Sequence, residues 1–134
     1  MLLLDTCVLS EGVKPQPAPP VVEWMDRQDP AELFISVVSL GELHYGVARM
    51  AVGARRRNLE AWLAEVDENF AGRVLVLDDA IARRWGRLRA ANPDTPVVDA
   101  QIAATALTYG LIFATRNVRH FRFDDLTVVN PWEN

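Results

Sequence analysis

Three acidic residues, Asp5, Glu42 and Asp99, occur where strands and helices of the chain are expected to meet. If their side chains converge, the carboxylates repel one another, and some would take up protons unless a cation lies among them. Hard divalent cations suit such oxygen ligands. Mg²⁺ in particular binds one or two carboxylates, several waters and a substrate phosphate. The matching chemistry is phosphodiester hydrolysis, in which the metal makes water more acidic and stabilises charge on the phosphoryl oxygens.

Each acid has a plainer explanation when it is considered alone. Asp5 follows an apolar run and could cap the next helix. Glu42 could be a surface residue, and Asp99 could interact with the dipole of its own helix. The metal site is favoured only if the fold brings the three carboxylates to one place. The hypothesis therefore depends on the strands and helices that carry these residues.

Short apolar runs alternate with segments of helical periodicity. Strands are expected at residues 2–4, 33–35, 74–77, 111–114 and 127–129. Helices are expected around residues 21–25 (ending near residues 29–30), from 39, from after Gly53 to 70, from 81 to about 92, and from 97 to 109, with Gly110 as a C-terminal cap. The proline-rich residues 11–20 predict a loop. The pattern predicts an α/β fold in one domain, residues 1–134, with a parallel sheet covered by helices on both faces.

This fold would bring the acids together. Ligands of an open parallel sheet bind beyond the carboxyl ends of its strands. Asp5 directly follows the first strand, Glu42 lies one helical turn beyond the residues after the second, and Asp99 lies in the helix before the fourth. The segment 115–117 follows the fourth strand and reaches the same edge. We therefore expect these residues to line one pocket.

Composition limits the partners of the chain. The net charge of −4 argues against a general polyanion binder, which is usually basic. Thirteen of the fourteen basic residues are nevertheless arginine, whose planar fork donates two hydrogen bonds to a phosphate. These arginines either contact a polyanion or form solvated helix faces. Their clusters are Arg55, Arg56 and Arg57; Arg83, Arg84, Arg87 and Arg89; and Arg116, Arg119 and Arg122.

The sequence indicates a cytoplasmic protein without a membrane segment. No run approaches the roughly 20 apolar residues that cross a bilayer. The N-terminal residues lack the basic start and the cleavage site of a signal peptide. Cys7, the single cysteine, cannot form an internal disulfide and is expected to be a small core residue.

Four segments in order resemble the motifs of PIN domains, and the match spans almost the whole chain. Residues 2–11 (LLLDTCVLSE) are similar to the family's opening strand with its first acid. Residues 34–43 (FISVVSLGEL) are similar to the second motif, 96–106 (PVVDAQIAATA) to the third and 114–121 (ATRNVRHF) to the fourth. The prolines after Glu11 look most like the VapC toxins related to FitB.

The resemblance implies a five-stranded parallel sheet of order 3-2-1-4-5 and an endoribonuclease toxin that depends on Mg²⁺ or Mn²⁺. It assigns the metal to Asp5, Glu42 and Asp99, with hydrogen-bonding support from Ser39 and Thr115. It also implies a homodimer, in which the helices bearing Trp62 and Trp85 are candidate interfaces. A VapB-like antitoxin would occlude the acids and make the only contact with DNA. By family analogy, the substrate would be transfer RNA.

One position departs from the family pattern. Many PIN domains have a fourth acid in the last motif, where this chain has Asn117. An amide oxygen can still bind a metal or a water but brings no charge, so a second metal would bind more weakly. We keep Asn117 among the candidate catalytic residues. His120 and His44 are nearby candidates, for which surface or packing roles are the plainer interpretation.

Several other activities are disfavoured. Receiver domains need paired acids after the first strand and a lysine near the last, whereas here Thr6 and Cys7 follow Asp5 and the only lysine is Lys14. A haloacid-dehalogenase-like phosphatase would need an acid at position 7. No glycine-rich phosphate loop follows the first strand. The serious alternative is a catalytically weak PIN protein that acts mainly as the dimeric partner of a DNA-binding antitoxin in autoregulation.

Overall fold

The computed structural model describes residues 1–133, in which five parallel strands form one sheet of order β3-β2-β1-β4-β5. The central strand pairs with a neighbour on each side, so that Leu3 lies opposite both Phe34 and Phe113. This arrangement confirms the predicted α/β fold and strand order. The strands are β1 (Leu2–Leu4), β2 (Leu33–Ser36), β3 (Val74–Leu75), β4 (Ile112–Ala114) and β5 (Val128–Val129).

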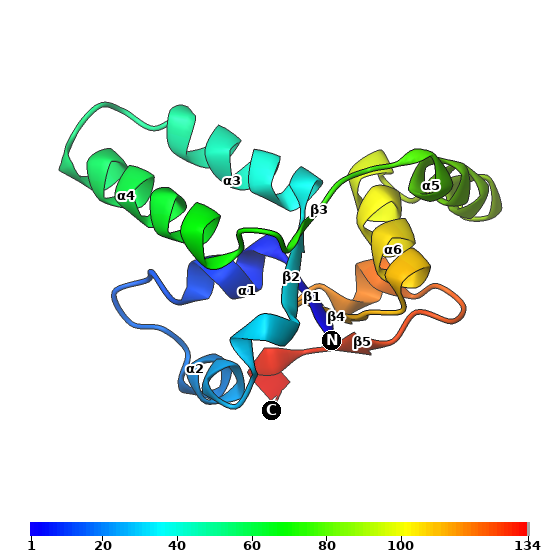
Figure 1. Ribbon diagram of the computed structural model, residues 1–134, viewed down its shortest axis with the longest axis horizontal. Helices are drawn as coiled ribbons and strands as arrows, with labels where there is room; N and C mark the ends of the chain where they lie inside the picture. Colours follow the sequence, from blue (N-terminus) through cyan, green and yellow to red (C-terminus); the bar gives the residue numbers. More distant parts are fainter. Residues whose placement is uncertain (134) are drawn as a thin grey trace.

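Helices cover both faces of the sheet (Figure 1). They are α1 (Thr6–Glu11), α2 (Pro19–Asp26), α3 (Val37–Ala48), α4 (Ala54–Asn69), α5 (Asp79–Ala91) and α6 (Val97–Tyr109), with single 3-10 turns η1 (Pro30–Glu32), η2 (Val118–Phe121) and η3 (Pro131–Glu133). Successive side chains of a strand point to opposite faces. Accordingly, Leu3 packs in the core beneath α6, and Leu4 packs in a second core with α1 and α4.

Several element boundaries differ from the predictions. The expected loop at residues 11–20 is shorter, because Glu11 ends α1 and Pro19 begins α2, where its fixed φ suits the first helical turn. Helix α1 itself was not predicted. Helix α2 ends at residue 26, before the expected position. Strand β3 ends at Leu75, because its partner Ser36 is the last residue of β2 and α3 begins directly after it.

The sheet edge that carries the candidate residues is formed by the ends of β1 and β4. The amide of Asp5 donates to the carbonyl of Ala114 at 3.0 Å, and the amide of Thr115 donates to the carbonyl of Val129 at 3.0 Å. The residues directly after these two strands are therefore held side by side. Helix α6 has the predicted bounds and ends at Gly110, whose left-handed φ of 64° forms its C-cap. Within residues 1–133, no helix is long and apolar enough to cross a membrane.

Candidate active site

Asp5 is a buried carboxylate held by three donors. Its side chain is 7% exposed. Its Oδ1 accepts a hydrogen bond from the amide of Thr6 at 2.8 Å, which caps α1. Its Oδ2 accepts from the Thr115 hydroxyl at 2.6 Å and from the Cys7 thiol at 3.6 Å. Asp5 is thus both the predicted cap and a fixed negative charge at the carboxyl edge of the sheet.

Glu42 on α3 and Asp99 on α6 share the electrostatic field of Asp5. Partial burial raises the pKa of Glu42, and the charges of Asp5 and Asp99 raise it further. Burial also raises the pKa of Asp99; the nearby His120 opposes this shift, and Asp5 adds to it. The fold therefore brings the three predicted acids within electrostatic reach of one another: Asp5 makes ionisation of Glu42 and Asp99 more costly, and Asp99 makes ionisation of Glu42 more costly.

The segment after β4 supports this site from the side. The amide of Asn117 donates to the Thr115 hydroxyl oxygen at 3.0 Å, and that hydroxyl in turn donates to Asp5. Thr115 therefore provides the predicted support. His120 Nδ1 lies 3.9 Å from Asp99 Oδ2, although the imidazole is 66% exposed. His44, in contrast, is exposed on α3.

Two further side chains differ from the predictions. Ser39 was expected to hydrogen-bond to the acids, but its hydroxyl is buried and has no hydrogen-bond partner within residues 1–133. Ser36, not Ser39, caps α3 by accepting from the amide of Val38 at 3.1 Å. Cys7 packs against the core as predicted, but its contact with Asp5 was not foreseen. Burial is the main reason that the pKa of Cys7 is raised, so the thiol stays protonated and can donate.

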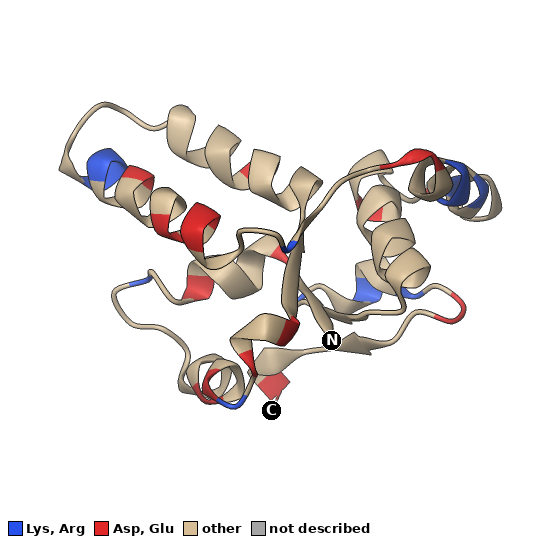
Figure 2. Cartoon of the chain, in the orientation of Figure 1, with Lys and Arg blue, Asp and Glu red and all other residues tan. Residues whose placement is uncertain are grey.

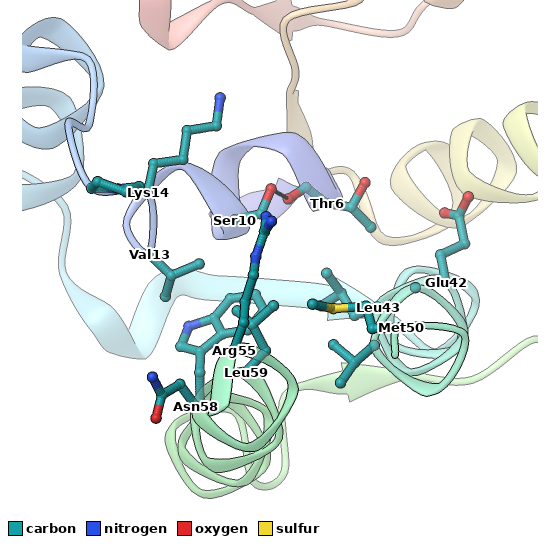
Figure 3. A pocket seen from close by; sticks show the side chains of 14 residues that line it. Thr6, Ser10, Val13, Lys14, Glu42, Leu43, Met50, Arg55, Asn58 and Leu59 are labelled. Carbon is teal, nitrogen blue, oxygen red and sulfur yellow. Dashed lines mark hydrogen bonds between the residues drawn. The ribbon is translucent and has the colours of Figure 1, made fainter. Parts of the chain in front are cut away.

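A groove of about 970 Å³ runs between α1, α3 and α4, and of the three acids Glu42 lines it (Figure 3). Thr6 and Glu42 lie at one end, and their side chains point the same way. Leu43 and Leu59 are among the apolar side chains that line the groove, as is Trp62, and Arg55 extends into it from α4. Its volume is in the range of ligand sites, about 300–1,000 Å³. Glu42 is therefore open to a ligand larger than a metal ion.

The donor set fits a divalent cation that is only partly bound by protein. Within residues 1–133, no three Asp, Glu, His or Cys side chains form a preformed metal cage. Mg²⁺ does not need one, because it commonly keeps several waters and takes ligands from a phosphate. The carboxylates of Glu42 and Asp99, whose ionisation is opposed by other acids, are oxygen ligands that a cation would stabilise.

The sequence profile of the PIN domain family matches residues 2–126. The chain belongs to the PIN domain family. This PIN domain is 40% identical to the plasmid stability protein StbB of Pseudomonas syringae pv. tomato, with 99% of each chain covered. It is 34% identical to toxin FitB of Neisseria gonorrhoeae over the whole of both chains. It is 38% identical to the VapC ribonuclease Y4jK of Sinorhizobium fredii, again with 99% of each covered.

The likeness extends to a solved complex. A chain in the structure of FitAB bound to the IR36 DNA fragment superposes with a TM-score of 0.92 at 33% identity, covering 98% of this PIN domain and 96% of that chain. The agreement therefore includes the strand order and the edge of the sheet at which Asp5 lies. It supports the family resemblance found in the sequence motifs.

Proposed function

We propose that this PIN domain is an endoribonuclease toxin that depends on Mg²⁺ or Mn²⁺. The observation that carries the proposal is the shared field of Asp5, Glu42 and Asp99 at the carboxyl edge of the sheet, where two of the three carboxyl groups have raised pKa values. The ribonuclease and toxin names of its relatives support the choice of RNA and of a toxin. Transfer RNA is the substrate class that we would test first.

Each candidate residue has a distinct role in this proposal. Asp5 provides a carboxylate whose position is fixed by its donors, and Glu42 and Asp99 provide carboxylates that reach the same space from two helices. The bound cation would supply a more acidic water and charge stabilisation on the phosphate. Asn117 would add an amide oxygen without charge, which favours one tightly bound metal over two. Thr115 positions Asp5 and does not touch the substrate.

The proposal includes a partner for the acidic site. We infer that a VapB-like antitoxin neutralises the toxin by covering the groove and the acids, and that any contact with DNA is made by that antitoxin. The FitAB structure bound to DNA supports this assembly. A homodimer in the cytoplasm would space two antitoxin units along a palindromic operator. The second candidate, a catalytically weak partner of the antitoxin, follows from Asn117 in place of the fourth acid.

The test is a metal-rescued cleavage assay. Purified protein would be incubated with total transfer RNA in Mg²⁺, in Mn²⁺ or in EDTA, beside the Asp5→Asn and Asp99→Asn variants. Discrete fragments that need metal and disappear in both variants are the expected result. Equal fragments from all three proteins would show that a contaminating nuclease, and not this protein, cleaves the RNA. Absence of cleavage with antitoxin-dependent DNA binding intact would favour the regulatory partner.

A further inference from the structure

A second hollow, distinct from the long groove, lies beside the acids. It has a volume of about 410 Å³ and is formed by the segment after β4 together with the last turn of the described chain. Figure 2 shows basic residues on the short stretch between β4 and β5, close to the edge of the sheet. The basic side chains that line it are Arg116, Arg119, His120 and Arg122, the asparagines are Asn117 and Asn130, and the one acid is Glu133.

The arginines of this hollow are available to a ligand. Arg116 is held by the ring of Trp132, with 5.1 Å between its guanidinium carbon and the ring centroid. Trp132 packs against the core that contains Leu4, so this guanidinium rests on a firm support. Arg119 and Arg122 are exposed and have no acidic partner within salt-bridge distance in residues 1–133.

Other arginines of the chain are engaged elsewhere. Arg56 pairs with Glu60 at 3.3 Å, and Arg83 lies 3.7 Å from Asp79. Arg73 donates to three backbone carbonyls. Such pairing is the ordinary use of a surface arginine. The cluster after β4 therefore differs from these residues, because its positive charges converge on a hollow and not on acids of the same helix.

The hollow shares a wall with the candidate active site. His120 lines it and lies 3.9 Å from the Asp99 carboxylate. Asn117 also lines it. The backbone amide of Asn117 donates to the hydroxyl oxygen of Thr115, and this hydroxyl donates to the Asp5 carboxylate. A polyanion that approaches three acids is repelled unless positive charge acts on it nearby. Arg119 is the chain neighbour of His120 and lines the same hollow, so its positive charge can supply that attraction beside Asp99.

We propose that this hollow is a phosphate-binding subsite, which holds a backbone phosphate of the RNA next to the bond at the acids. This inference rests on the proposed nuclease function and names how its substrate is held. Guanidinium groups suit phosphate because they donate two hydrogen bonds in one plane. The side-chain amides of Asn117 and Asn130 add hydrogen-bond donors and acceptors for a neighbouring ribose.

The test measures RNA binding without cleavage. In an Asp99→Asn background with Mg²⁺, the affinity for a fluorescent single-stranded oligoribonucleotide would be compared with and without Arg119→Gln and Arg122→Gln. The matched control is Arg84→Gln with Arg87→Gln on α5, which removes the same charge from two arginines that line a different hollow and have no acidic partner within salt-bridge distance in residues 1–133. We expect affinity to fall roughly tenfold in the first pair only. The salt dependence of log K should also become shallower by about 0.7, which is the contribution of one phosphate contact in single strands.

Two outcomes would overturn the subsite. Equal losses of RNA affinity in the Arg119 and Arg122 variant and in the control variant would show a general attraction of RNA to positive charge. Unchanged affinity in the Arg119 and Arg122 variant would show that RNA does not bind in the hollow. Circular dichroism of each variant would establish that it is folded. If the wild type cleaves no RNA but the hollow variants still lose binding, the nuclease function fails and the subsite stands. In an active protein, the Arg119→Gln and Arg122→Gln pair should raise KM with little change in kcat.

Discussion

Asp5 and Asp99 are both acids of one site, but the fold treats them differently. Asp5 follows the central strand, is 7% exposed and receives hydrogen bonds from an amide, a hydroxyl and a thiol. Asp99 lies in the first turn of α6, and the imidazole of the exposed His120 lies 3.9 Å from its carboxylate. Glu42 resembles Asp99, because its pKa is raised by burial and by the other two acids.

This difference distinguishes a carboxylate whose hydrogen bonds stabilise the fold from carboxylates whose charge the fold does not stabilise. Donors that stabilise an ionised carboxylate contribute to folding, and the cap of α1 depends on them. Carboxylates held near like charges cost stability unless something else binds them. Such perturbed groups cluster at functional sites. The fold therefore satisfies the carboxylate of Asp5 with hydrogen bonds, whereas burial and neighbouring acids oppose the ionisation of Glu42 and Asp99.

The largest expected effect tests this separation directly. Asp99→Asn should reduce RNA cleavage on the order of a thousandfold, since a metal ligand supplies several kcal/mol of transition-state stabilisation. The same variant should unfold in urea at the same or a higher concentration, because a repelled charge is removed. Asp5→Asn should lose cleavage and stability together. Equal destabilisation by the two variants would contradict the comparison.

The second effect concerns the donor that holds Asp5. Thr115 is fully buried, and its hydroxyl joins the Asp5 carboxylate to the amide of Asn117. Thr115→Val should destabilise the protein by about 1–3 kcal/mol, because it leaves buried polar groups without a partner. Thr115→Ser is the control, since it keeps the hydroxyl and loses one methyl, which costs about 0.8 kcal/mol. Urea unfolding measures both, and equal losses would assign the effect to packing alone.

The third effect is a dependence of stability on pH. Because folding raises the pKa of Glu42 above its ordinary value of 4.5, the folded state binds its proton more tightly than the unfolded state does. The stability present below pH 4.5 is therefore lost as the pH rises through the folded pKa. Glu42→Gln should gain up to about 1 kcal/mol at pH 7, discounted because the side chain reaches solvent, and little at pH 4.

A metal titration sharpens the same prediction. Mg²⁺ should stabilise the wild type more at pH 7 than at pH 4, because it competes with protons for the carboxylates. The gain should be smaller in Glu42→Gln. Urea midpoints at the two pH values, with and without Mg²⁺, provide the comparison. A Glu42→Gln protein that is less stable than wild type at pH 7 would show that the carboxylate has a favourable partner.

The sequence predicted the acids of this site better than their surroundings. The position of Asp5 at the edge of the sheet could be predicted because Asp5 directly follows a short apolar strand. The end of α6 could be predicted because Gly110 is a typical C-terminal cap. Helix α1 was missed because its six residues show no full helical period. His120 contacts Asp99 because the fold places η2 beside α6, which no pattern within one segment predicts. Cys7 contacts Asp5 locally at the start of α1, so this contact was missed together with the helix.

The smallest expected effect concerns the two serines at the start of α3. Ser36 caps the helix by accepting from the amide of Val38, whereas Ser39 is 1% exposed and its hydroxyl has no partner in residues 1–133. Ser36→Ala should cost about 1 kcal/mol, the usual value of a helix cap. Ser39→Ala should cost a few tenths of a kcal/mol at most, because it removes no hydrogen bond.

Repeating the serine comparison in saturating Mg²⁺ connects it to the acids. Ser39 lies one turn before Glu42 on the same helix, so a hydroxyl without a partner is available if metal binding draws the carboxylates together. If Ser39→Ala lowers the stabilisation by Mg²⁺ but not the stability without metal, the hydroxyl pairs only in the loaded site. If the loss is the same with and without metal, the hydroxyl takes no part in the loaded site. Its burial without a partner in residues 1–133 is then a small cost of the fold that metal binding does not relieve.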